Sequence, residues 1–130
     1  MNNRGKQTDI GQAGNRKGVP VFGDIHAMAL QRQIEKSVSN AFQVPERELR
    51  ARTRRKAHTA FARQVAMYLA HVGCGMSYSE VGRLFGRDRT TAAHACRLIE
   101  DRRDDPGLDL SLDHLEQAVR HWADRRIMHS

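Results

Sequence analysis

Apolar side chains recur every three or four positions through most of the chain after residue 23. Each run has the 3.6-residue period of an amphipathic helix, with polar residues at the positions between. Glycine, proline and capping residues separate one run from the next. The pattern predicts an all-α fold, a small helical bundle, with helices over 24–43, 45–49, 59–74, 77–85, 88–101 and 109–126.

The segment 77–103 has the clearest helix start and stop signals in the chain. Ser77 and Glu80 have the spacing of a capping box, which satisfies free amide groups at the start of a helix. Gly86 is suited to ending that helix, because glycine takes the left-handed conformation without steric cost. Asp88 can then cap the next helix. The sequence therefore predicts two helices joined by a tight turn, the first with the apolar face Tyr78, Val81, Leu84 and Phe85.

The helix after Asp88 has two distinct faces. Small and apolar residues form one face and let this helix approach its neighbour closely: Ala92, Ala95, Cys96 and Ile99. Polar and basic residues form the opposite face and are free to meet a partner: Thr90, His94, Arg97 and Asp101. This is the layout of a DNA-reading helix-turn-helix.

The exposed start of this second helix carries the candidate base contacts Asp88, Arg89, Thr90 and Thr91. An aspartate can accept a hydrogen bond from a cytosine amino group, and a threonine methyl packs on the thymine methyl. Asp88 has an alternative role as a purely structural N-cap.

A basic run precedes the long helix 59–74. Five of the seven residues from 50 to 56 are cationic, which defines a basic loop over 50–58. Arg52 and Lys56 in this loop are candidate phosphate contacts, and so are Arg63 and Gln64 near the start of the long helix. The core stripe of that helix is Phe61, Val65, Tyr68, Leu69 and Val72.

The first and last helices lack such chemistry. Asp24 is a candidate N-cap for 24–43, a helix expected to pack on the domain's own core, with dimerisation as the alternative. Ser111 is a candidate cap for 109–126, after a loop at 102–107. The apolar stripe of the helix 109–126 is expected to cover the open side of the bundle, and it consists of Leu112, Leu115, Val119 and Trp122.

Composition narrows the class of protein. The formal net charge of +7 suggests a polyanionic partner. No apolar run approaches the ~20 residues that span a membrane. Cys74 and Cys96 lie in apolar helical contexts without CxxC spacing and are expected to be reduced core thiols. No His/Cys cluster has metal-ligand spacing. Residues 1–23 and 127–130 are expected to be tails around one helical domain, 24–126, in a cytoplasmic, nucleoid-associated protein.

Residues 85–97, F-G-R-D-R-T-T-A-A-H-A-C-R, resemble the signature of the C-terminal DNA-binding domain of the bacterial replication initiator DnaA. That family's pattern is typically F-G-(x)-R-D-H-T-T, a few residues, then H-A. The resemblance extends from about Val38 to Trp122 and implies a TrpR-like helical bundle that binds double-stranded DNA.

The resemblance also implies roles for individual residues. Counting back from the Arg63-Gln64 pair, Arg55 matches the family's minor-groove arginine, and Arg54 is the alternative because the loop carries one residue more than usual. His94 would contact a phosphate, although a structural histidine is the other interpretation, and Arg97 would contact a phosphate as well.

This chain departs from the family pattern in two ways. Arg89 stands where the family usually has histidine, and the turn before Asp88 is one residue shorter than in many members. Arginine pairs bidentately with guanine, so the DNA motif is expected to be related to the family's but altered.

The sequence has no G-x-x-x-x-G-K-[ST] string, so no nucleotide, cofactor or enzymatic activity is expected. The favoured hypothesis is a stand-alone DNA-binding protein without the ATPase domain, acting as a bacterial transcriptional regulator. Two alternatives are a modulator of replication initiation that competes for initiator sites and a protein interaction module.

Overall fold

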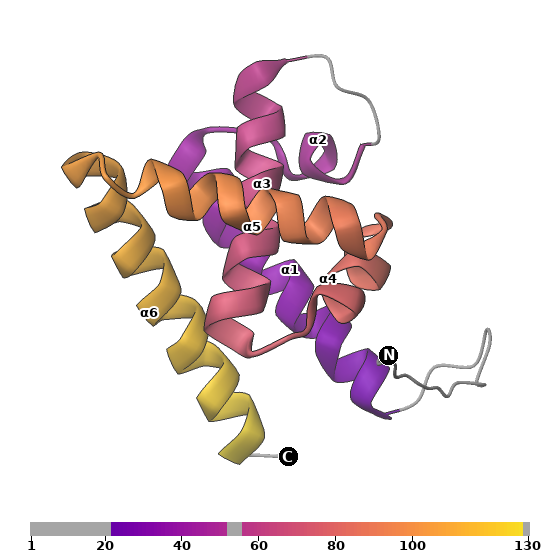
Figure 1. The fold of residues 1–130 in the computed structure, drawn as a ribbon. Coiled ribbons are helices and arrows are strands. Elements are labelled where there is room, and N and C mark those ends of the chain that lie inside the picture. Colours follow the sequence, from indigo (N-terminus) through magenta and orange to yellow (C-terminus); the bar gives the residue numbers. More distant parts are fainter. Residues whose placement is uncertain (1–21, 52–55, 129–130) are drawn as a thin grey trace.

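Helix α3 (Ala57–Cys74) runs through the middle of the fold and contacts the five other helices of the described residues. This computed structural model describes residues 22–51 and 56–128. In Figure 1, α5 crosses in front of α3 while α1 passes behind it and α6 runs along one side. The predicted all-α bundle is confirmed, with the other helices being α1 (Phe22–Phe42), α2 (Glu46–Arg50), α4 (Tyr78–Phe85), α5 (Arg89–Arg102) and α6 (Pro106–Met128).

The apolar stripe of α3 forms the centre of the core. Val65, Tyr68 and Leu69 are buried as predicted, and Phe61 and Val72 pack partly buried against them. Full burial of a side chain such as Leu69 stabilises the fold by about 1.5–3 kcal/mol. Neighbouring helices contribute the other large, fully buried apolar side chains: Ile34, Val38, Val81, Ile99, Leu112 and Val119.

Helix α1 packs behind α3 in the view of Figure 1 and α6 packs along its side, and the two also contact each other. Leu30 of α1 joins the core with Ile34 and Val38, as expected for packing on its own domain. Dimerisation through 24–43 stays a prediction; Ile25 and Met28, near the start of α1, are 56% and 52% exposed.

Both of these helices begin earlier than predicted. Helix α1 starts at Phe22, so Asp24 lies inside it and is not its N-cap. Helix α6 starts at Pro106, which places Ser111 in its second turn and corrects the prediction that Ser111 caps it. Proline is preorganised for the first helical position, and the Asp109 amide already donates to the Asp105 carbonyl at 2.8 Å.

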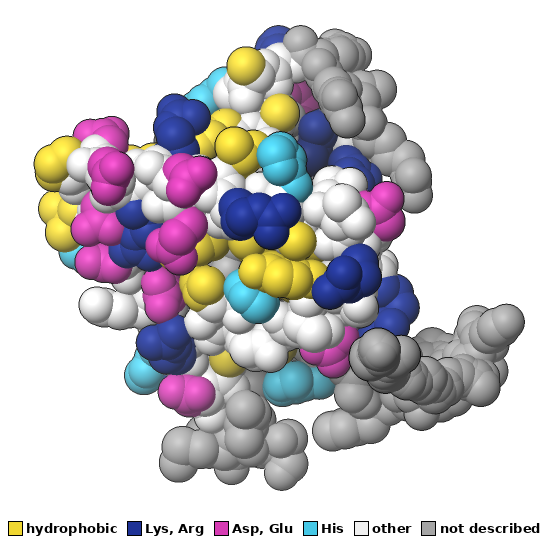
Figure 2. Space-filling view, in the orientation of Figure 1, with side chains coloured by type: hydrophobic (Ala, Val, Ile, Leu, Met, Phe, Trp, Pro, Cys, Tyr) yellow, Lys and Arg dark blue, Asp and Glu magenta, His cyan; other side chains and the backbone are white. Residues whose placement is uncertain are grey.

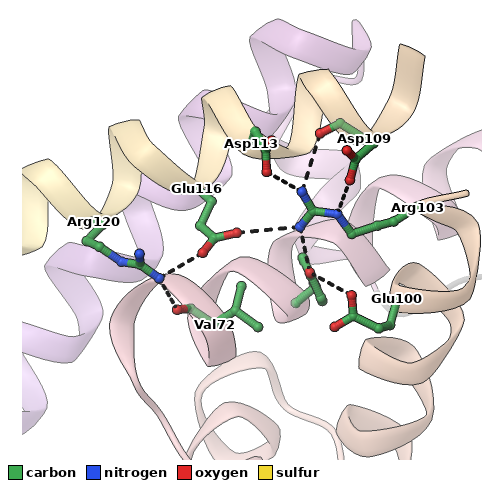
Figure 3. Close-up of polar contacts among 8 residues, drawn as sticks. Val72, Glu100, Arg103, Asp109, Asp113, Glu116 and Arg120 are labelled. Atoms are coloured by element: carbon green, nitrogen blue, oxygen red, sulfur yellow. Dashed lines mark hydrogen bonds and ion pairs between the residues drawn. The ribbon is translucent and has the colours of Figure 1, made fainter. Parts of the chain in front are cut away.

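The end of α5 is fixed by Arg103, which follows its last residue. Its guanidinium, 16% exposed, forms ion pairs with three carboxylates of α6, those of Asp109, Asp113 and Glu116 (Figure 3). It also donates a hydrogen bond to the Tyr68 hydroxyl of α3. The surrounding exposed acids make the α5–α6 junction an acidic end of the molecule (Figure 2).

Both cysteines are free thiols. Cys96 is buried and Cys74 is half-buried. Burial raises the pKa of each thiol to about 11. Within the described residues, no helix is long and apolar enough to span a membrane, and no group of three metal-ligating side chains is present.

Candidate nucleic-acid interface

Two glycines shape the turn between α4 and α5. Gly86 ends α4 with a φ of 70°, the left-handed conformation that the sequence predicted. The backbone of the turn passes close to Gly82. A Cβ at this position would lie 2.6 Å from the Arg87 carbonyl oxygen. Because α4 begins with the predicted capping box of Ser77 and Glu80, both of its ends are fixed by local sequence.

Asp88 caps α5, as predicted. Its Oδ1 accepts a hydrogen bond from the Thr91 amide at 2.7 Å. This bond from the Thr91 backbone, followed by one from the Thr91 side chain, lowers the pKa of the Asp88 carboxyl. The Asp88 side chain is exposed, so capping does not remove its carboxylate from solvent.

The first turn of α5 presents its polar side chains outward. Arg89, Thr90 and Thr91 are exposed, and so are His94 and Arg97 further along. The opposite face packs into the core through the residues predicted for it: Ala92, Ala95, Cys96 and Ile99.

A hollow of about 630 Å³ lies between α3 and the start of α5. It brings together candidate residues that are far apart in the sequence, Arg63 and Gln64 from α3 with Thr90, Thr91 and His94 from α5. Three apolar residues form the remaining lining together with Arg87: Ala60, Met67 and Ala95.

Arg63 has partners within the protein. Its Nε donates to the carbonyls of Glu48 and Leu49 at 3.3 and 3.2 Å, and its Nη2 donates to Glu48 at 2.9 Å. Partial burial and the positive charge of Arg87 lower the pKa of the Arg63 guanidinium, while Glu48 opposes them. Two cations that repel one another across a hollow favour an anion between them.

Arg87 is the lining residue that sequence reasoning missed. It belongs to the turn and donates to the carbonyls of Phe85 and Gly86 at 3.4 and 3.3 Å. Arg87 directly precedes the N-cap of α5. This position could have predicted a phosphate contact from the sequence, because a helix start favours anions and a cation beside it adds to that effect.

The other candidates lie outside this hollow. Arg89 and Arg97 are exposed elsewhere on α5, and Lys56 is exposed at the N-cap position of α3. Arg52, Arg54 and Arg55 fall outside the described residues. Figure 2 shows Lys and Arg side chains across the middle and right of the face that carries α5, opposite the acidic end.

A capped helix, a glycine turn and a second helix with an exposed polar start define a helix-turn-helix domain. The chain belongs to the family described as bacterial dnaA protein helix-turn-helix, whose model matches residues 31–99. The predicted family is confirmed.

Relatives and a solved structure agree with this assignment. The chromosomal replication initiator proteins DnaA of Paraburkholderia phymatum and Burkholderia vietnamiensis are each 39% identical over 92 residues. The match covers 67% of this chain but 17% of each relative. A crystal structure of a DNA replication initiation factor superposes with a TM-score of 0.68 at 27% identity, covering 78% of this chain and 31% of that one.

Proposed function

We propose that this protein binds double-stranded DNA in a sequence-specific manner, with the start of α5 in the major groove. One observation carries the proposal: the hollow beside that helix start collects donors and cations from α3, the turn and α5. Converging cations in a hollow suit an anion such as a backbone phosphate.

Two groups of residues divide the work. Arg63, Gln64, His94 and Arg97 contact phosphates and set the register of the protein on the duplex. The start of α5 approaches base edges through Asp88, Arg89, Thr90 and Thr91. Asp88 combines capping with base contact, since its side chain is exposed while it caps the helix.

The basic loop supplies a second set of contacts. We propose that Arg55 enters the minor groove, with Arg54 as the alternative, and that Arg52 and Lys56 neutralise phosphates nearby. A long cationic side chain suits the narrow groove, where the negative potential is concentrated.

DNA binding serves transcription regulation in this proposal, by a protein that acts at the nucleoid. The similarity to chromosomal replication initiator proteins favours a second candidate, modulation of replication initiation by competition for initiator sites. The two differ in where the protein binds on a chromosome, which mapping of bound sites in cells separates.

The proposal is tested by selecting bound duplexes from a random pool. The affinity for the most enriched duplex is then measured at increasing salt concentration. Neutralisation of ~6 phosphates gives a slope of log affinity against log salt near −5. A pool that yields no common motif contradicts sequence-specific binding. Weak, salt-insensitive binding to every duplex points instead to a protein interaction module.

A further inference from the structure

Glu35 is a buried carboxylate of α1 that faces a short neighbouring helix. Its side chain is 2% exposed. Oε1 accepts a hydrogen bond from Arg50 Nε at 3.0 Å, and Oε2 accepts one from Gln31 at 3.1 Å. Arg50 is the last residue of α2, so this ion pair attaches the end of α2 to α1.

The same end of α2 is attached to α3 through Arg63, which lines the hollow described above. Arg63 donates to the carbonyls of Glu48 and Leu49, the two residues before Arg50. Those carbonyls thereby hold the Arg63 guanidinium in one orientation at the edge of the hollow. The position of α2 therefore sets the direction of a cation on the candidate DNA surface.

We infer that Glu35 is a positioning residue for DNA binding. It acts through Arg50 and the backbone of α2 on the guanidinium of Arg63, and it touches no DNA itself. This inference rests on the proposed function, because it assigns Arg63 to a phosphate. A buried carboxylate is costly to desolvate, and Glu35 offsets that cost with its bonds to Arg50 and Gln31.

The test measures duplex affinity, its salt slope and base preference for Glu35→Gln in the full chain. Glutamine keeps the shape and removes the charge that holds Arg50. We expect affinity to fall roughly three- to tenfold. The salt slope should fall by about 0.9, the value for one phosphate contact, while base preference stays that of the wild type.

Arg63→Ala completes a double-mutant cycle. If Glu35 acts through Arg63, adding Glu35→Gln to Arg63→Ala weakens binding no further. Independent losses in the two variants overturn the inference, and so does wild-type affinity in Glu35→Gln.

Glu46→Gln is the matched control. Glu46 pairs with the same guanidinium at 3.2 Å, but it lies on α2 itself and is 40% exposed, so it does not tie α2 to α1. Its variant should bind like the wild type; an equal loss there contradicts the inference. If Glu35→Gln does not fold, Arg50→Gln takes its place, because the Arg50 side chain is 47% exposed. In the Arg63→Ala background it should weaken binding no further, and a further loss there overturns the inference. A wild-type chain with no salt-dependent duplex binding overturns the proposed function, and this inference with it.

Discussion

The guanidinium of Arg103 donates a 2.8 Å hydrogen bond to the hydroxyl of Tyr68, joining the end of α5 to the middle of α3. The same group pairs with carboxylates of α6, so three helices meet at one side chain. A charge that is 16% exposed loses much of its hydration, and these partners replace it.

Arg103→Ala should therefore destabilise the fold by about 1–3 kcal/mol, because it removes the donor to the Tyr68 hydroxyl and the cation shared by Asp109 and Asp113. Urea denaturation measures the change. Arg102→Ala is the control: that neighbour lies over the Phe61 ring at 5.0 Å, an exposed contact worth about 0.5–1 kcal/mol. Equal losses in the two variants contradict a special role for Arg103.

Gly82→Ala should destabilise the helix-turn-helix. The added methyl would meet the Arg87 carbonyl oxygen at 2.6 Å, and backbone cannot move aside as a flexible side chain does. We expect a loss of about 1–3 kcal/mol, measured by thermal denaturation. Gly107→Ala serves as the control, since the nearest atom there is the Asp105 Oδ1 at 4.0 Å and alanine is the better helix former.

Asp88 should make part of the stability depend on pH. Its hydrogen bonds with Thr91 lower the pKa of the carboxyl in the folded chain. The stabilisation is then present above the unfolded pKa, near 3.9, and is lost as pH falls through the lower folded pKa. Asp88→Ala should be less stable than the wild type at pH 7, and the gap should narrow below about pH 4. A gap that stays constant down to pH 2 would contradict this cap.

Arg89 and Arg97 should affect DNA binding in different ways. Arg89→His should change the preferred base at one position, by roughly tenfold or more, because arginine pairs bidentately with guanine. Arg97→Ala should weaken binding to all sequences alike and lower the salt slope by about 0.9. Competition between duplexes with single base changes measures both effects. Identical behaviour of the two variants refutes the assigned roles.

Local signals along the chain predicted the helix-turn-helix well. The roles of Ser77, Gly86 and Asp88 depend on neighbours within four residues, so their side chains carry the information themselves. Pro106 and Gly107 misled for the same reason, since both residue types mark turns as readily as a helix start. The start of α6 consequently lay three residues before the expected one.

Contacts between distant segments could not be predicted in this way. Arg63 was expected to be free for a phosphate, and its bonds to Glu48 and Leu49 depend on where α2 packs. Nothing in the position of Glu35 along α1 distinguishes it from an exposed acid. It is nevertheless 2% exposed, because α2 packs over it. Periodicity assigns a residue to a face, whereas only the packing of three helices decides what that face meets.

The separation of charge between the two ends of α5 gives the molecule an electric dipole. The half-buried Arg87 and the exposed Arg89 lie at its start, whereas Asp101, Asp104 and Asp105 are exposed where it ends. A polyanion exerts a torque on such a dipole at separations of about one Debye length, ~8 Å in physiological salt. A molecule that arrives with its acidic end forward is turned before contact, so the approach itself selects the productive orientation.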